Sequence, residues 1–173
     1  MSASRTVLAD DESGVDELRS AYRPRRVKTL FVGESSPAQG THFYRANSNL
    51  FRATHAAFAE ALGNDAVPMG EVFLRLFATK GCWLVDLADR PVNQLDARER
   101  RQAVEEGVPR LAELIGETRP KQVVVIKRDI AGAVEQAIAL AGVKKPAVLL
   151  LRYPLRQYRA EFVRELAAFV RDL

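Results

Sequence analysis

The segment Gly33–Tyr44, with the sequence G-E-S-S-P-A-Q-G-T-H-F-Y, carries residues that are well suited to chemistry. Glu34 lies two residues beyond the apolar run Val27–Val32, where a carboxylate can face a cleft and orient a water molecule. Phe43 and Tyr44 offer flat rings on which a nucleobase could stack. In the simpler alternative, Glu34 caps a helix and Phe43 belongs to the core.

Serine hydrolases, dinucleotide-binding enzymes and P-loop enzymes are not predicted. G-E-S resembles the G-D-S block of the SGNH esterases, but those enzymes take a catalytic histidine from near the C-terminus, and the two histidines here are His42 and His55. The G-x-S-x-G nucleophile elbow fails because Pro37 occupies the place of its last glycine. No G-x-G-x-x-G or G-K-[ST] follows a predicted strand, which argues against dinucleotide and P-loop enzymes.

The elements that must position these residues follow from the hydrophobic periodicity. Four short apolar runs are predicted as buried strands: Val27–Val32, Cys82–Leu87, Gln122–Ile126 and Ala147–Leu151. Helices are predicted over residues 10–22, 49–62, 68–78, 129–141 and 156–172, with Asp129 as the cap of the fourth. Asp96 and Glu99 form a capping signal for a further long helical stretch, which Pro109 is expected to divide or kink.

Strands that alternate with helices and are apolar throughout indicate a parallel sheet covered on both faces. We therefore predict an α/β fold with three layers, α/β/α, around a mainly parallel four-stranded sheet. In such folds the site lies beyond the carboxyl ends of the strands. The loops of interest are then Gly33–Tyr44, Asp86–Asn93 and Arg152–Arg159.

Length and composition narrow the class of protein. A chain of 173 residues fits one domain, predicted here over residues 10–173 with a flexible tail at 1–9. The single cysteine, Cys82, excludes an internal disulfide and a cysteine-rich metal site. No apolar run reaches the roughly 20 residues of a membrane helix, so we expect a cytoplasmic protein. A net charge of +4, with a basic C-terminal third, mildly favours a polyanionic partner.

Four segments, in this order, carry a resemblance to a known family. They are FVGESSPAQGTHFYRANSNLFR, CWLVDLADRP, RPK followed by QVVVI, and LLLRYPLRQYRAEF. The first is similar to that family's first motif, in which a strand ends in Gly and is followed by a polar loop and an aromatic residue. The last takes the place of a His-Pro-Ser loop and the helix behind it. From about Val27 to Val170 the chain resembles the uracil-DNA glycosylase superfamily, through the order and spacing of these motifs.

The resemblance implies roles for residues in the first two loops. Glu34 would hold or activate the attacking water. Phe43 or Tyr44 would stack on a base flipped out of DNA, because chemistry on a base requires its extrusion. Gly33 and Asp86 would complete the base-binding site.

The resemblance also implies roles for the last loop. Tyr153 would take the catalytic position in which many members carry a His. Leu155 would wedge into the duplex, and Arg156 and Arg159 would contact phosphates.

Two positions depart from the family pattern. Asp86 replaces an Asn whose amide both donates to and accepts from uracil; an ionised carboxylate only accepts, so a base edge rich in N–H donors suits it better. Tyr153 cannot offer a departing base anion the positive charge of a His. Uracil is therefore not the expected substrate. Alternatively, Asp86 only pairs with Arg90 or Arg152.

We therefore expect a DNA glycosylase-like enzyme that hydrolyses the N-glycosidic bond of a modified base, with DNA as its partner and with no cofactor or metal. It would be monofunctional, since no lysine is placed in the site loops to attack as a Schiff base. The alternative is a non-catalytic protein that binds nucleic acid or nucleotides in the same cleft. His55, Cys82 and Trp83 are expected in the core. The basic run Arg98–Arg101 is expected on a solvated helix face.

Overall fold

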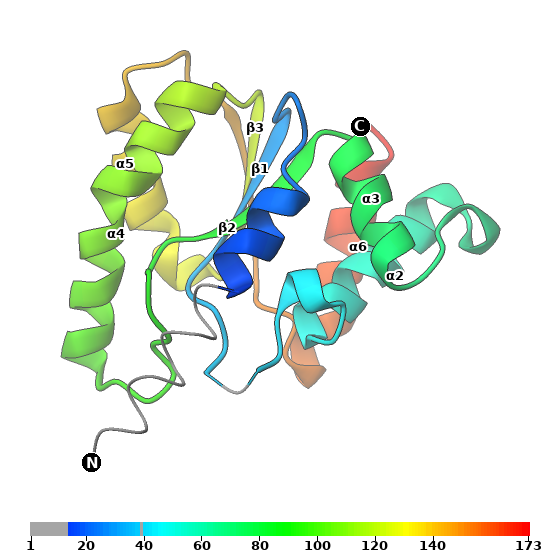
Figure 1. Ribbon diagram of the computed structural model, residues 1–173, viewed down its shortest axis with the longest axis horizontal. Coiled ribbons are helices and arrows are strands. Elements are labelled where there is room, and N and C mark those ends of the chain that lie inside the picture. The colour runs from blue at the N-terminus through cyan, green and yellow to red at the C-terminus, as the bar shows by residue number, and fades with distance from the viewer. Residues whose placement is uncertain (1–13, 39) are drawn as a thin grey trace.

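A four-stranded sheet forms the centre of the computed structural model, which describes residues 14–38 and 40–173 (Figure 1). The strands are β1 (Thr29–Gly33), β2 (Cys82–Asp86), β3 (Gln122–Ile126) and β4 (Ala147–Leu151). Their order is β2-β1-β3-β4 and all pairings are parallel. The tail predicted at 1–9, and the predicted start of the first helix at Asp10, lie outside the described residues.

Helices cover both faces of the sheet (Figure 1). On one face α4 (Ala97–Thr118) packs against α5 (Ala131–Ala141), and on the other α2 (Asn49–Leu62) packs against α6 (Arg159–Val170), beside α3 (Glu71–Thr79). Further elements are a helix over 14–21 and the 3-10 turns η1 (Phe43–Arg45), η2 (Asn64–Ala66), η3 (Arg128–Ile130) and η4 (Arg156–Tyr158). The predicted three-layer α/β/α fold is therefore confirmed.

The two edge strands of the sheet, β2 and β4, differ in burial. Every residue of β1 and β2 is buried, as is β3 after Gln122, so the prediction of fully buried strands is confirmed for these three strands. It is wrong for β4, where Val148 is 42% and Leu150 38% exposed. β2 and β4 are the two edge strands, but the helix over 14–21 lies against β2, where Trp83 Nε1 donates to the Arg19 carbonyl at 3.0 Å.

α4 continues through Pro109 without interruption, so the predicted division into two helices is wrong. Pro109 is exposed, and water can therefore bond the carbonyl group that loses its partner one turn earlier. On the buried side of the same helix, Gly107 lies directly against Leu87. Packing on this side holds the helix to the segment that follows β2.

Three other helix boundaries differ from the prediction. α3 begins at Glu71 rather than at residue 68, because Gly70 precedes it in a left-handed conformation with φ of 69°. Asp129 does not cap α5: the cap position is Ile130, and the Asp129 side chain is 78% exposed. The final helix is preceded by the η4 turn and begins only at Arg159.

The connections that follow β1 and β3 create a crevice at the carboxyl ends of these two central strands. After β1 the chain passes to α2 on one face, and after β3 it passes to α5 on the opposite face. β1 and β3 are neighbours, so their two loops diverge at the carboxyl ends of adjacent strands. In open α/β sheets ligands bind at such a switch point.

We predict that α4 tolerates alanine at one of its glycines and not at the other. A Cβ atom on Gly107 would lie 1.8 Å from the Leu87 carbonyl oxygen, so Gly107→Ala should lower the free energy of unfolding by about 1–3 kcal/mol. Gly116→Ala is the matched control, since the nearest atom to its new Cβ is 3.8 Å away. It should raise stability by up to about 1 kcal/mol, because Ala is the better helix former. Urea unfolding measures both, and equal effects would contradict the close approach at Gly107.

Candidate functional site

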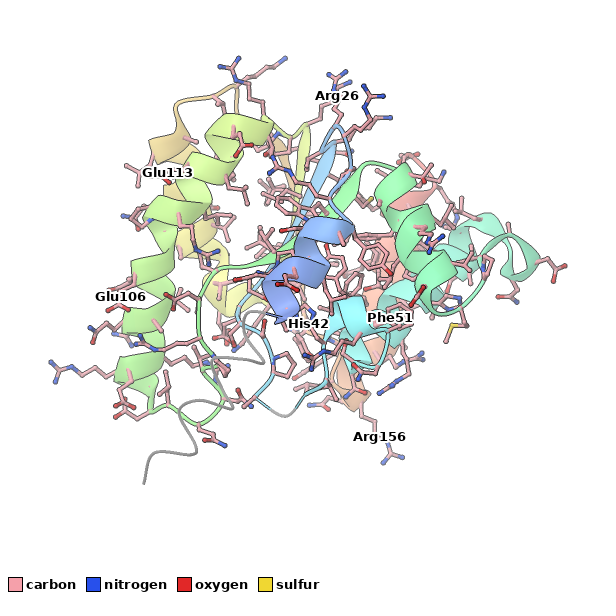
Figure 2. All side chains as sticks on the ribbon, viewed as in Figure 1. Arg26, His42, Phe51, Glu106, Glu113 and Arg156 are labelled. Carbon is pink, nitrogen blue, oxygen red and sulfur yellow. The ribbon has the colours of Figure 1, made fainter. Side chains whose placement is uncertain are left out.

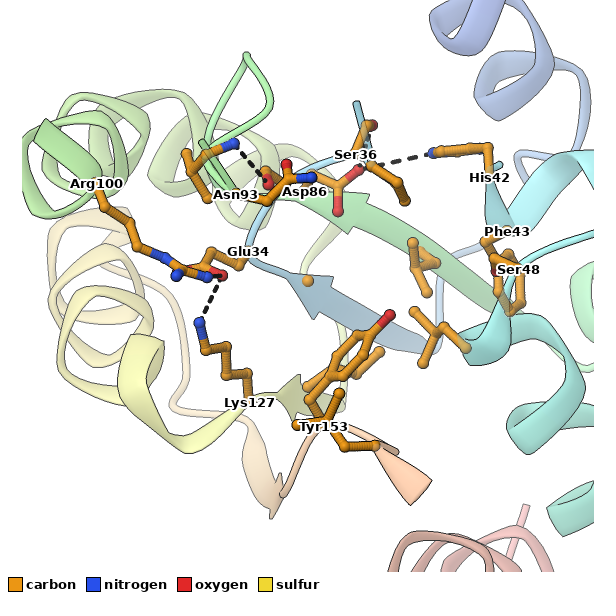
Figure 3. A pocket seen from close by; sticks show the side chains of 18 residues that line it. Glu34, Ser36, His42, Phe43, Ser48, Asp86, Asn93, Arg100, Lys127 and Tyr153 are labelled. Atoms are coloured by element: carbon orange, nitrogen blue, oxygen red, sulfur yellow. Dashed lines mark hydrogen bonds and ion pairs between the residues drawn. The ribbon is translucent and has the colours of Figure 1, made fainter. Parts of the chain in front are cut away.

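A cleft of about 470 Å³ opens at the carboxyl ends of the strands and brings together most of the predicted site residues. Gly33, Glu34, Phe43, Asp86, Tyr153 and Leu155 all line it (Figure 3). These residues come from the carboxyl ends of β1 and β2, from the residues that follow β1 and β4, and from the start of η1. The rule that places a site beyond the strand ends therefore located the cleft from the sequence.

Tyr44 lies in the core rather than in the cleft wall. It is 2% exposed, and its hydroxyl accepts from the Leu84 N–H at 2.8 Å and donates to the Leu84 carbonyl at 3.0 Å. Its ring stacks on Tyr22 with centroids 5.7 Å apart. Both the ring and the hydroxyl are thus engaged inside the protein, and Tyr44 fastens η1 to β2 instead of offering a face to a base.

Arg156 and Arg159 are exposed and lie outside the cleft lining. They belong to η4 and to the start of α6, next to Leu155, which is 48% exposed at the rim. The Arg156 side chain projects away from the body of the protein (Figure 2). These cations are accessible to a partner that covers the mouth of the cleft.

Glu34 is held by two cations at one side of the cleft (Figure 3). Arg100 donates from Nε to Oε1 at 2.6 Å and from Nη2 to Oε2 at 2.5 Å, and Lys127 Nζ lies 2.7 Å from Oε2. Burial alone would raise the pKa of Glu34, but the hydrogen bonds and charges of Arg100 and Lys127 hold it below its usual value. Glu34 is therefore ionised at neutral pH.

Asp86 is buried and is also compensated, though not by the partners that the sequence suggested. Arg19 Nη2 donates to Oδ2 at 2.9 Å and Ser36 Oγ donates to it at 3.0 Å. The suggested pairing with Arg90 or Arg152 is wrong, because those arginines pair with Glu106 and Glu161 respectively. Burial would raise the pKa of Asp86, yet the nearby His42, Arg19 and Ser36 together lower it.

The second carboxylate oxygen of Asp86 remains available to a ligand. The parallel register pairs Gly33 with Asp86, and a Cβ atom on Gly33 would lie 2.7 Å from Oδ1. The missing side chain of Gly33 therefore makes room for this oxygen in the cleft. Oδ1 accepts no hydrogen bond from any residue that the structure describes, so it can accept one from a bound molecule.

His42 faces Asp86 from the η1 side of the cleft (Figure 3). Its Nδ1 accepts from the Tyr44 N–H at 3.2 Å, so in the neutral ring Nε2 carries the proton, 3.8 Å from Asp86 Oδ2. The Ser36 hydroxyl donates to Asp86 and not to His42. Ser36, His42 and Asp86 therefore share one cleft without the hydrogen-bond order of a hydrolase triad.

Phe43 and Tyr153 form the aromatic part of the wall. Phe43 is 2% exposed and packs edge-on against Tyr44 at 5.2 Å, so only a small part of its ring is open to the cleft. Tyr153 is half-buried; burial, and then the charge of Asp86, raise its pKa. Its hydroxyl therefore stays protonated at neutral pH and can donate a hydrogen bond.

Three cations that bind the cleft carboxylates were missed by the sequence reasoning. Arg100 belongs to the run Arg98–Arg101 that was predicted on a solvated face, and for Arg100 this is wrong because its guanidinium reaches Glu34. Arg19 comes from the helix over 14–21, for which the sequence carried no functional signal. Lys127 did have a signal: it directly follows β3, in the position that singled out Glu34 after β1.

Two of the three residues predicted in the core, Cys82 and Trp83, lie there. Cys82 is fully buried and Trp83 is 6% exposed. His55 is half-buried, and its Nε2 lies 2.9 Å from the Val67 carbonyl oxygen. None of the three lines the cleft, so they stabilise the fold and take no part in the site.

In comparisons with known proteins, no protein-family model and no curated protein matches the chain. Over residues 14–38 and 40–173, no group of three or more His, Cys, Asp and Glu side chains is placed to hold a metal ion. No helix in the same part of the chain has the length and apolar character required to cross a bilayer. The assignment of function therefore depends on the chemistry of the cleft.

We predict that the compensated Asp86 makes stability depend on pH. Its pKa is lowered in the folded state from the ordinary 3.8, so its contribution is complete above that value and is lost as pH falls through the folded pKa. Asp86→Asn should cost about 1–3 kcal/mol at pH 7, and the difference from the wild type should shrink below about pH 4. Urea unfolding at several pH values measures this, with exposed Asp65→Asn as control. A difference that stays constant with pH would contradict the ion pair.

Proposed function

We propose that the protein is a DNA glycosylase-like enzyme, which binds a modified base flipped out of DNA and hydrolyses its N-glycosidic bond. The observation that carries this proposal is the position of two carboxylates, Glu34 and Asp86, in one cleft with a largely apolar and aromatic wall. The resemblance of the sequence motifs to the uracil-DNA glycosylase superfamily supports the same chemistry. A glycosylase needs such an arrangement: one group for the water and another for the base.

Glu34 suits the role of holding the water and stabilising charge. As the bond to the base breaks, positive charge develops on the sugar, and an ionised carboxylate stabilises it. Arg100 and Lys127 keep the pKa of Glu34 low, which makes it a weak base. A weak base is sufficient here, because water that adds to a cationic sugar becomes acidic as its new bond forms. Glu34 therefore orients the water first and receives its proton late.

Asp86 suits the role of reading the base edge. Its free Oδ1, beside Gly33, can only accept hydrogen bonds while the carboxylate is ionised. A guanine edge presents adjacent N1–H and N2–H₂ donors, whereas uracil presents O4 to the same oxygen. Guanine alkylated at N7 adds a positive charge that a carboxylate attracts and that helps the base to leave. We therefore expect purines of this kind as substrates rather than uracil.

Tyr153 suits the role of a neutral donor to the departing base. Its raised pKa keeps the hydroxyl protonated, so it can donate a hydrogen bond but cannot carry the positive charge of a protonated His. Stabilisation of the departing base is then modest. This again favours bases that leave easily.

The second candidate function is binding without catalysis. The observation that favours it is the pair of cations on Glu34, with separations of 2.5 to 2.7 Å, since a carboxylate so fully engaged has less capacity to bind water. The same cleft would then hold a nucleotide or an extruded base and release it unchanged.

We predict that the protein cleaves at least one damaged base and that cleavage requires Glu34. Oligonucleotides that contain uracil, hypoxanthine, xanthine or 7-methylguanine, in single and double strands, would be incubated with the purified chain. Glu34→Gln should reduce the cleavage rate by at least about 100-fold, because a neutral amide stabilises the cationic sugar poorly. Glu113→Gln, on the outer side of α4, is the matched control (Figure 2).

The two candidate functions give different results in this assay. Cleavage of an N–H-rich base that is lost with Glu34→Gln and kept with Glu113→Gln supports the enzyme. A complete lack of cleavage, together with retained binding of DNA or nucleotides, would favour the binding protein. Preferred cleavage of uracil would contradict the role proposed for Asp86.

We predict that Arg156 and Arg159 contact DNA phosphates at the rim of the cleft. Arg156→Ala with Arg159→Ala should weaken DNA binding and reduce the slope of log K against log salt by roughly two, because each lost phosphate contact retains about one more counterion. Arg25→Ala with Arg26→Ala is the matched control: both are exposed and precede β1, at the opposite end of the sheet (Figure 2). An unchanged slope in a filter-binding titration would remove Arg156 and Arg159 from the interface.

A further inference from the structure

The cleft has two ends of different chemistry (Figure 3). Arg100, Glu34 and Lys127 meet on one side, whereas His42 and Phe43 lie on the other. The lining also contains apolar side chains: Leu50, Leu84, Val92, Ile126 and Leu155. A ligand that fills this space must combine a flat or apolar part with a group that suits the charged end.

Lys127 is a second cation on a carboxylate that Arg100 already satisfies. Arg100 binds both oxygens of Glu34 in a two-pronged contact, the strongest geometry for such a pair. Lys127 Nζ adds a further contact at 2.7 Å and keeps N–H groups that Glu34 does not use. Arg100 Nη1 bonds to none of the residues that the structure describes. Donors thus remain on both sides of Glu34 at this end of the cleft.

The backbone at Lys127 is strained. Its φ is 101° with ψ of 114°, a conformation that costs a residue with a Cβ atom free energy and that glycine adopts more easily. The Lys127 N–H donates to the Leu151 carbonyl at 3.0 Å, which fixes the turn at the ends of β3 and β4. Strain of this kind persists where the surrounding structure enforces it, and it gathers at ligand sites. Here it directs an amine into the cleft.

We propose that Lys127 and Arg100 form a phosphate subsite, which holds the phosphate of a nucleotide whose base occupies the other end of the cleft, near Phe43. The placement of the base rests on the proposed function; the phosphate contact does not depend on any reaction. A phosphate accepts several hydrogen bonds from Lys and Arg at once. Nucleotides join a flat ring to an anion across a sugar, and the two ends of the cleft match this arrangement.

Two carboxylates oppose the phosphate: Glu34, which contacts both cations at 2.5 to 2.7 Å, and Asp129. Asp129 Oδ2 lies 3.7 Å from Lys127 Nζ, and the Asp129 side chain is 78% exposed. Water screens such an exposed charge, and the distance is too long for a hydrogen bond. Removal of the Asp129 charge should therefore strengthen phosphate binding, whereas removal of the Lys127 amine should weaken it.

The test is isothermal titration of the full chain with deoxyguanosine, with 5′-dGMP and with inorganic phosphate. We expect the wild type to bind dGMP at least about tenfold more tightly than deoxyguanosine, as a charge-assisted contact requires. Lys127→Met should remove this advantage and Asp129→Asn should increase it. Lys145→Met is the matched control, since Lys145 is exposed and precedes β4 at the opposite edge of the sheet.

A second measurement tests the strain. Lys127→Gly and Lys127→Met both lack the amine, but only glycine relieves the positive φ. We expect thermal unfolding to give a higher Tm for Lys127→Gly than for Lys127→Met, while both lose the preference for dGMP. A lower Tm for the glycine variant would overturn the strain argument, and the proposal with it.

The source of the phosphate is decided by a parallel titration with a single-stranded pentanucleotide. A larger loss for the pentanucleotide than for dGMP on Lys127→Met assigns the subsite to a DNA strand, and a larger loss for dGMP assigns it to a free nucleotide. The proposal is overturned if the wild type binds dGMP no better than deoxyguanosine, fails to bind dGMP at millimolar concentration, or keeps its preference in Lys127→Met. A negative glycosylase assay with retained phosphate-dependent binding would remove the enzyme and leave this subsite intact.

Discussion

The position of β1 between β2 and β3 is the constraint on which the site depends. Parallel pairing aligns Gly33 with Asp86 on one side and Val32 with Val125 on the other, so three strands end at nearly the same level. Glu34 and Lys127 can then meet across 93 residues of sequence. Because side chains alternate along a strand, a shift of one residue would turn each of them to the other face of the sheet.

The helical layers set the charge state of the cleft as well as covering the sheet. Burial by itself would favour the protonated form of Glu34 and Asp86. Arg100 from α4 and Arg19 from the N-terminal helix reverse this, since each brings a cation to a carboxylate at the end of a strand. Neither arginine would reach its partner without the packing of its helix. The cleft therefore owes its two ionised carboxylates to cations from two helices that pack around the sheet.

Two glycines allow close packing on both sides of the segment that carries Asp86. Gly33 leaves space for the carboxylate, and Gly107 leaves space for the Leu87 carbonyl one residue later. Arg110 Nη2 then donates to the Asp86 and Leu87 carbonyls at 2.9 and 3.0 Å. Backbone contacts of this kind leave Asp86 little freedom, as the role proposed for it in reading a base edge requires.

The sequence by itself determined the layered α/β fold, because short apolar runs and helical periodicity report local burial. The rule that places ligands beyond strand ends singled out Glu34 and the loops that contain Asp86 and Tyr153, which the family resemblance then picked out. It would have found Lys127 had it been applied to β3. Only the tertiary structure decided which of the neighbours Phe43 and Tyr44 faces the cleft, since the η1 turn has no fixed periodicity. It also brought Arg19 and Arg100 to carboxylates 67 and 66 residues away. Such pairs depend on how helices pack across the sheet, and this is a property of the whole chain rather than of any local pattern.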